Sequence, residues 1–305
     1  MKTKLLLTFI LVGIVHTISA NTYPITPRPL RKLVKEAKYI VFASVIKIEK
    51  NVTGEDWHSA KATLVVKKTL QGKIKHDTIS VFFASNMICP APANYTKNST
   101  VLAFLNKKQD GKGYFTHALS YGSKTINQEA FLVYKKRIQE MQSILKIKKK
   151  VERDLKTVDW LVACASNKYT RWEGTYELSP TSDFMSSYDR DKETFTRKIF
   201  LDRKHIQSLT KAFLEVDKVT YQDMGLIDII ASVDDEIVLS FLTDQLKKAN
   251  LEEIWFSEFL LERVVYLSGR EDLKSILQEI NSIDFFDKEK SKKASVLIKR
   301  FIDEL

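Results

Sequence analysis

The chain has 305 residues, of which 44% are hydrophobic, and its formal net charge is +11. This apolar content predicts globular domains with buried cores and excludes an intrinsically disordered chain. Cys89 and Cys164 are the two cysteines, too few for a disulfide-dense scaffold. They allow either one bridge between domains or two separate thiols. We favour separate thiols, because an unpaired Cys packs as a small hydrophobic residue.

The first twenty residues predict a secretory signal peptide. Lys2 and Lys4 precede an apolar core from Leu5 to Val15, and the small residues Thr17 and Ser19 have the spacing that a signal peptidase needs. An uncleaved anchor is the alternative, but a spanning helix needs roughly 20 apolar residues. We therefore expect an extracytoplasmic protein, periplasmic or secreted, without a membrane span.

Residues 21–127 are predicted to form a β domain. Five segments are rich in Val, Ile, Phe, Thr and Tyr, and turn residues such as Gln71-Gly72 and Asp110-Gly111 separate them. Apolar and polar residues alternate within several of them, which indicates one buried face and one wet face. The segments are 38–51, 60–73, 77–83, 100–106 and 113–122. Five strands at this spacing predict a small barrel or sandwich, and a short amphipathic helix around residues 30–37 precedes them.

Core and turn positions of these segments follow a recognisable pattern. The positions are Ala37, Val45, Leu70, Gly72, Leu102, Phe104, Leu105 and Gly122. The pattern resembles the secreted TIMP-like, or netrin-type, OB-fold domain found in extracytoplasmic proteins, including uncharacterised proteins of Bacteroidota, and the resemblance covers residues 30–125. It implies a five-stranded OB-like barrel. Ala43 stands where the family usually has Gly, and Gln71 stands where it usually has Lys.

Animal proteins with this fold include metalloproteinase inhibitors that act through an N-terminal Cys. The mature chain predicted here would begin near Ala20 or Asn21 and has no Cys there. The resemblance therefore carries no inhibitory role to this protein.

Charge is unevenly distributed along the chain. Residues 21–156 carry 26 Lys and Arg against 10 Asp and Glu, whereas residues 157–305 carry 21 against 28. Such asymmetry is typical of a polyanion-binding face or of solvated surface. Candidate polyanion-binding residues are Lys146, Lys148, Lys149 and Lys150. OB folds often bind oligonucleotides or oligosaccharides, but an exported protein meets little nucleic acid, so we expect no nucleic-acid partner.

From Gln128 the apolar pattern changes to a helical period. Residues 128–156 predict basic connecting helices, and residues 157–305 predict an α-helical domain. Its later amphipathic segments lie near 203–215, 222–232, 235–248, 253–268, 271–281 and 289–304. Short links between them predict an antiparallel stack similar to HEAT repeats, although no period of identical residues is present. The predicted fold class is therefore α+β and multidomain, with an OB-like barrel followed by an all-α stack.

The stretch TRWEGTYELS, residues 170–179, allows two interpretations. As a ligand site it would use Arg171, Trp172, Glu173 and Tyr176. As a structural corner it would pack the aromatic rings between helices and pair Arg171 with Glu173 or Glu177.

The sequence lacks the motifs of common enzymes and metal sites. It contains neither HExxH nor CxxC, and residues 189–193 begin like a calcium loop but lack its glycine and distal Glu. Residues 118–122 are an Ala variant of the GxSxG motif that ends a predicted strand instead of opening a helix. We therefore expect a non-catalytic exported binding or scaffold protein with no cofactor, whose partner is an extracytoplasmic protein or an anionic polymer. The alternatives are a secreted hydrolase with an unrecognised site and a weak polyanion or glycan binder that acts through the basic β domain.

Overall fold

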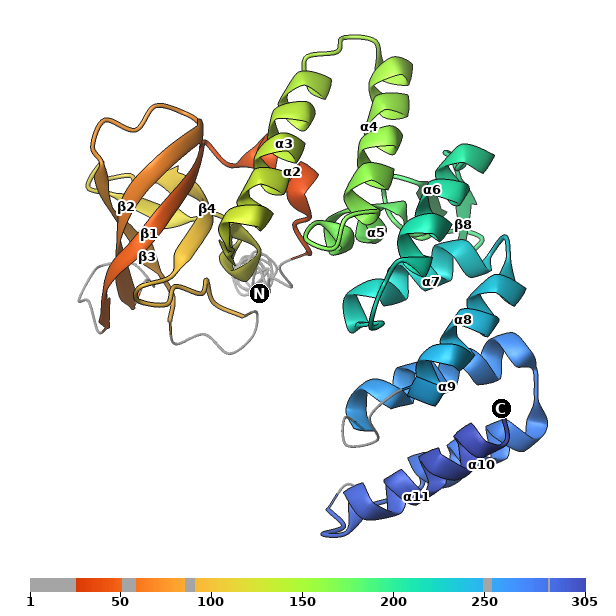
Figure 1. Ribbon diagram of the computed structural model, residues 1–305. Helices are drawn as coiled ribbons and strands as arrows, with labels where there is room; N and C mark the ends of the chain where they lie inside the picture. Colours follow the sequence, from red (N-terminus) through yellow and green to blue (C-terminus); the bar gives the residue numbers. More distant parts are fainter. Residues whose placement is uncertain (1–25, 51–58, 86–90, 249–253, 285) are drawn as a thin grey trace, which may run out of the picture. The chain divides into compact units, whose positions relative to one another are not determined.

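A computed structural model describes residues 26–50, 59–85, 91–248, 254–284 and 286–305 (Figure 1). Contacts divide the chain into two compact units. One contains Glu36–Ile126 together with the residues up to Arg28, and the other contains Pro29–Lys35 and Asn127–Leu305. The predicted signal peptide lies outside the described residues. Within the described ranges, no helix combines the length and the apolar character that crossing a membrane requires.

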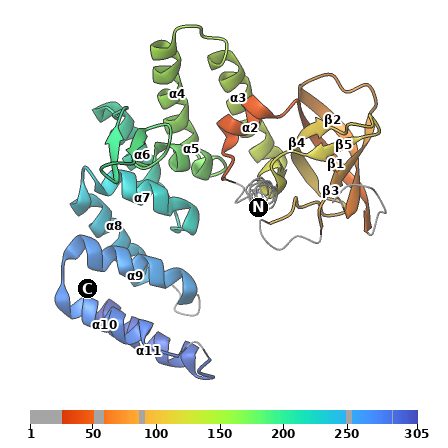
Figure 2. The same ribbon diagram turned by 180° about the vertical axis from the view of Figure 1, so that it is seen from behind.

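The first unit is a closed five-stranded β-barrel. This confirms the OB-like barrel that the sequence predicts for the N-terminal domain. Around the barrel the strand order is β1-β2-β3-β5-β4, and β1 pairs with β4 to close it. Neighbouring strands are antiparallel except β3 and β5, which are parallel. The bounds are β1 (Tyr39–Lys50), β2 (Ala60–Gln71), β3 (Thr78–Phe83), β4 (Thr100–Lys107) and β5 (Tyr114–Thr116) (Figure 2).

Side chains alternate across the barrel wall. On β3, Ile79, Val81 and Phe83 are buried, whereas Ser80 and Phe82 between them are partly exposed. The buried positions join apolar residues of β1, β2 and β4 in one core. A strand with one buried face leaves its other face for the surface, so Ser80 and Phe82 can contribute to a surface groove.

The last predicted strand, 113–122, is shorter than expected. Its β part ends at Thr116, because Ala118 and Leu119 have positive φ angles of 57° and 52°. A 3-10 turn, η1 (Leu119–Gly122), follows and leads to the short strand β6 (Ser123–Thr125), which pairs with β4. Residues in the left-handed region interrupt a strand, and the GxSxG-like segment therefore forms this turn.

The second unit is a helical stack, as predicted. It comprises α2 (Leu30–Glu36), α3 (Gln128–Ile144), α4 (Lys150–Ala165), α5 (Arg171–Leu178), α6 (Arg203–Leu214), η2 (Tyr221–Asp223), α7 (Met224–Ala231), α8 (Asp235–Lys248), α9 (Ile254–Ser268), α10 (Glu271–Asn281) and α11 (Lys290–Asp303). Helices that follow one another in sequence pack together, as α6 to α11 illustrate in Figure 1. Although the short helix α2 precedes the barrel strands in sequence, most of it groups with these helices.

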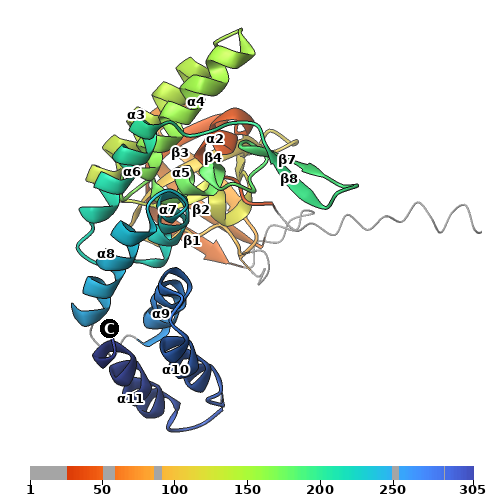
Figure 3. The same cartoon turned by 90° about the vertical axis from the view of Figure 1, so that its right-hand side faces the viewer.

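A β-hairpin within the second unit was not predicted. Strand β7 (Ser186–Asp189) pairs with β8 (Thr194–Arg197), and residues 190–193 of the calcium-loop-like segment form the connecting turn (Figure 3). Each strand has four residues, so alternation is too brief to recognise. Tyr188 and Phe195 lie opposite one another with ring centroids 5.0 Å apart, and both remain about half exposed.

A substitution at Gly72 tests how closely the chain packs directly after the end of β2. Its φ angle is +77°, and an added Cβ would lie 2.5 Å from a Tyr39 ring carbon and 2.6 Å from the Lys38 carbonyl oxygen. The Gly72→Ala variant should therefore lose about 2–5 kcal/mol of unfolding free energy, combining backbone strain with overpacking.

Gly111 provides a matched control for this variant. Its φ angle is +73°, but no atom lies within 4 Å of an added Cβ, so Gly111→Ala should lose only the backbone term of about 1–2 kcal/mol. Urea denaturation of both variants measures the difference. Equal losses would contradict the close packing of Gly72 against Tyr39.

Candidate functional site

Helix α5 contains most of the TRWEGTYELS stretch and lies unusually close to α4. A Cβ added at Gly174 would lie 2.4 Å from the backbone nitrogen of Ala165 and 2.4 Å from the carbonyl oxygen of Leu161. Two helices can approach this closely only where a residue has no side chain. Gly174 therefore fixes the position of α5, and with it the directions of the neighbouring side chains.

Arg171 connects α5 to η2. Its guanidinium is buried and pairs with the Asp223 carboxylate, while its Nε donates a hydrogen bond of 3.2 Å to the Ala165 carbonyl. The second Asp223 oxygen accepts the backbone N–H of Thr220 at 2.6 Å and its hydroxyl at 2.7 Å. The sequence interpretation that Arg171 pairs with Glu173 or Glu177 is wrong, because those carboxylates are engaged by α2 and the Arg171 partner comes from a distant turn.

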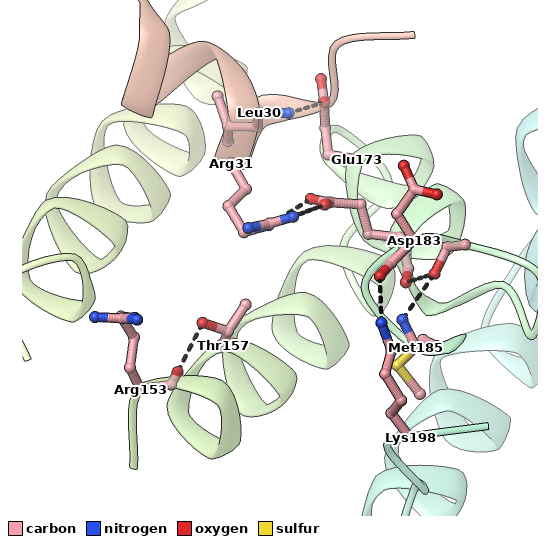
Figure 4. Close-up of polar contacts among 10 residues, drawn as sticks. Leu30, Arg31, Arg153, Thr157, Glu173, Asp183, Met185 and Lys198 are labelled. Atoms are coloured by element: carbon pink, nitrogen blue, oxygen red, sulfur yellow. Dashed lines mark hydrogen bonds and ion pairs between the residues drawn. The ribbon is translucent and has the colours of Figure 1, made fainter. Parts of the chain in front are cut away.

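Glu173 and Glu177 hold the short helix α2. Glu173 is 2% exposed and accepts the backbone N–H of Leu30 at 2.6 Å and the Tyr134 hydroxyl at 3.3 Å. The Nε–H of Arg31 is shared between the two Glu177 carboxylate oxygens, at 2.9 and 3.0 Å, and a terminal guanidinium nitrogen of Arg31 also donates to this carboxylate. Figure 4 shows Leu30 and Arg31 directed at these α5 carboxylates. Burial, and after it the Glu173 carboxylate, raises the pKa of the Tyr134 phenol.

Trp172 and Tyr176 lie on the other side of α5. Their ring centroids are 5.4 Å apart and the ring planes are inclined by 34°. Both residues line a surface hollow of about 340 Å³ that Tyr221 and Asp228 also line. The four residues predicted to bind a ligand thus divide into the buried pair Arg171 and Glu173 and the surface pair Trp172 and Tyr176. The ligand role of these residues stays a prediction.

The predicted polyanion-binding lysines lie around the connection between α3 and α4. Lys146, Lys148, Lys149 and Lys150 are all exposed. Lys150 opens α4 and pairs with Asp154 at 2.5 Å. Their binding role is likewise still a prediction.

Sequence reasoning missed a groove on the barrel. The groove has a volume of about 570 Å³. It is formed by residues of β2, β3 and β5, by the ends of β1 and β4, and by the β2–β3 and β4–β5 connections. Its cationic lining residues are Lys61, Lys73, Lys75, Lys107 and Lys112, with His76 beside them. Among the described residues that line it there is no Asp or Glu. The available signal was the concentration of lysines in the segments 61–75 and 107–112, on both sides of strand β3.

Most of these groove lysines have no acidic partner. Lys61 pairs with Glu49 at 2.9 Å. In the part of the chain that the structure describes, Lys73, Lys75, Lys107 and Lys112 form no ion pair. Like charges gathered in a hollow with protein walls raise the local positive potential. The groove therefore has a positive electrostatic potential that would attract an anion.

Aromatic rings complete the groove, and they contact one another and a lysine. The rings of Tyr39 and Tyr114 meet edge to face with centroids 5.1 Å apart. The Lys108 ammonium lies 4.5 Å from the centroid of the Phe82 ring. Partial burial, and secondly Tyr39, raises the pKa of the Tyr114 phenol.

Across the described ranges, no group of three or more His, Cys, Asp and Glu residues has the arrangement that a metal ion needs. Cys164 is a buried free thiol whose pKa is raised, mainly by burial. Cys89 lies outside the described residues.

Comparison with known proteins adds no assignment: no protein-family model and no curated protein sequence matches this chain. The fold alone defines its class, a protein that joins a closed OB-like barrel to a helical stack.

Replacing Arg171 tests whether its buried ion pair with Asp223 stabilises the fold. The Arg171→Ala variant leaves the Asp223 carboxylate buried without its partner, so the unfolding free energy should fall by about 3–5 kcal/mol. Urea denaturation measures the loss. Arg300→Ala is the matched control, because Arg300 forms an exposed ion pair of 2.6 Å with Glu279, and it should lose much less. Comparable losses would contradict the structural role of Arg171.

Proposed function

We propose that this protein is a non-catalytic exported binding protein whose barrel groove holds an anionic polysaccharide. The observation that carries the proposal is the set of five groove lysines, with no carboxylate among the lining residues that the structure describes. An extended polyanion can place several charged groups along such a groove at once. Each contact is weak when exposed to water, but their summed field attracts a polymer with repeated negative charges.

The geometry favours a polysaccharide over a single-stranded nucleic acid. Binding of single strands relies on open aromatic faces on which successive bases stack. In this groove the Lys108 ammonium lies over Phe82, and Tyr39 and Tyr114 pack edge to face. A glycan with sulfate or carboxylate groups needs the cations but not a series of open rings. The predicted signal peptide also supports an extracytoplasmic glycan.

We also propose that the barrel belongs to the TIMP-like, or netrin-type, group of OB-fold domains. The resemblance of residues 30–125 to the TIMP-like, or netrin-type, domain supports a member of that group for the barrel. The strand order β1-β2-β3-β5-β4, with the closing pair of β1 and β4, agrees with an OB-like barrel. The helical stack then serves as the part that connects the glycan-binding barrel to a second extracytoplasmic partner.

Matched charge removal tests the groove. We would measure the affinity of residues 21–305 for a heparin dodecasaccharide between 0.05 and 0.3 M salt, using fluorescence anisotropy. The variant Lys73→Ala/Lys107→Ala/Lys112→Ala removes three groove cations. It should bind more weakly, and its slope of log K against log salt should become shallower by roughly 2, taking about 0.7 per contact as for flexible single strands.

The control variant removes the same charge from the other unit. Lys146→Ala/Lys148→Ala/Lys149→Ala should retain the wild-type affinity and slope. Equal losses in both variants would show diffuse attraction, and a loss confined to the control would locate the site between α3 and α4. An oligothymidylate of equal charge that binds more tightly than the heparin oligosaccharide would overturn the polysaccharide assignment.

A further inference from the structure

A second hollow lies entirely within the helical unit. Helix α5, the segment that follows it, η2 and the start of α7 surround its volume of about 340 Å³. Pockets for small molecules start at roughly this size, about 300 Å³. The residues that line it include Trp172, Thr175, Tyr176, Thr181, Tyr221 and Asp228.

Three aromatic rings gather around this hollow. Trp172 and Tyr176 lie one helical turn apart on α5, and Tyr221 comes from η2. Tyr221 is 68% exposed, and its ring meets Phe259 of α9 at a centroid distance of 5.5 Å. Clustered exposed rings are uncommon on a protein surface and mark places where a ligand covers them.

The folding of α5 depends on a different set of side chains. Arg171, Glu173 and Glu177 bind η2 and α2 from their buried positions. Trp172 is partly exposed and Tyr176 is 36% exposed. The two rings thus line the hollow beside a helix that other residues anchor.

Polar groups between the rings are mostly uncharged. Thr175, Ser179, Thr181 and Ser182 supply hydroxyls, and Gln222 supplies an amide. The Thr175 hydroxyl donates to the Arg171 carbonyl at 3.1 Å, and the Ser182 hydroxyl donates to the Glu177 carbonyl at 2.6 Å. A hydroxyl that donates once still accepts through its lone pairs. These groups can therefore accept hydrogen bonds from a ligand rich in hydroxyls.

Asp228 is the one charged residue among those that line the hollow, and Arg263 already neutralises it. Their side chains pair at 2.5 Å. A cationic ligand would have to compete with Arg263 for this carboxylate, whereas a neutral hydroxyl can donate to it while the ion pair persists. The electrostatics therefore favour a neutral ligand over an amine.

We propose that this hollow binds a neutral saccharide of one or two pyranose rings. The C–H face of a pyranose packs against an aromatic ring, and its equatorial hydroxyls bond to the hydroxyls, the amide and the carboxylate around it. Aromatic rings provide apolar area at a small entropy cost, and Tyr adds a polar hydroxyl at its edge. This site is distinct from the lysine-lined barrel groove, and the proposal does not depend on that groove.

Saturation-transfer NMR with the full mature chain, residues 21–305, tests the site. The probes are the disaccharides and trisaccharides of glucose, galactose, mannose and N-acetylglucosamine, each at millimolar concentration, with choline as a cationic probe. At least one saccharide should bind. The exposed-ring variants Tyr176→Ala and Tyr221→Ala should each weaken its affinity roughly three- to tenfold, as expected for one aromatic contact.

Tyr188→Ala is the matched control, because Tyr188 is an exposed tyrosine of the β7–β8 hairpin and does not line the hollow. It should bind the saccharide with wild-type affinity, and circular dichroism verifies that all three variants fold. The proposal is overturned if none of the saccharides binds, if choline alone binds, or if the Tyr188 variant loses as much affinity as the other two. If the groove variant Lys73→Ala/Lys107→Ala/Lys112→Ala loses heparin binding, its binding of the neutral saccharide should still be unchanged.

Discussion

Two carboxylates on α5 hold the helix that precedes the barrel. Glu173 accepts the first backbone amide of α2, and Glu177 pairs with Arg31 in its first turn. The first amides of any helix lack intrahelical acceptors, and a helix of seven residues is too short to be stable alone. The contact therefore supplies both a cap and an anchor. Because α2 precedes β1 and α3 follows β6, the barrel is inserted between two elements of the helical unit.

Helix α5 consequently has sides with different roles. One side buries Arg171, which pairs with Asp223 of η2, and another side buries Glu173 and Glu177, which bind α2. Removing one partner of such a pair leaves a buried charge, so these positions tolerate little change. A different face carries Trp172 and Tyr176, which border the hollow. One eight-residue helix can thus be both a structural junction and one wall of a binding site, because residues one turn apart share a face.

The sequence predicts features that depend on local patterns and misses those that depend on distant pairing. Alternation around Ile79 and Val81 predicts β3, and the helical period after Gln128 predicts the stack. The partner of Arg171 lies 52 residues away at Asp223, and no local pattern identifies it. The lysine-lined barrel groove is similar, since its lysines come from separate strands and connections that meet only when the barrel closes. The local concentration of lysines in the sequence instead predicted a polyanion-binding site at residues 146–150. Four-residue strands with exposed rings, as in β7 and β8, are too short for a pattern.

A double-mutant cycle between Arg31 and Glu177 tests the central claim most directly. The unfolding free energies of Arg31→Ala, Glu177→Ala and the double variant would be measured by urea denaturation. Since the Glu177 side chain is 3% exposed and that of Arg31 is 22% exposed, water screens the pair only partly. The account predicts a coupling energy of about 1–2 kcal/mol, within the range of directly contacting residues. Additive losses, with a coupling below about 0.3 kcal/mol, would contradict the claim that α5 anchors α2.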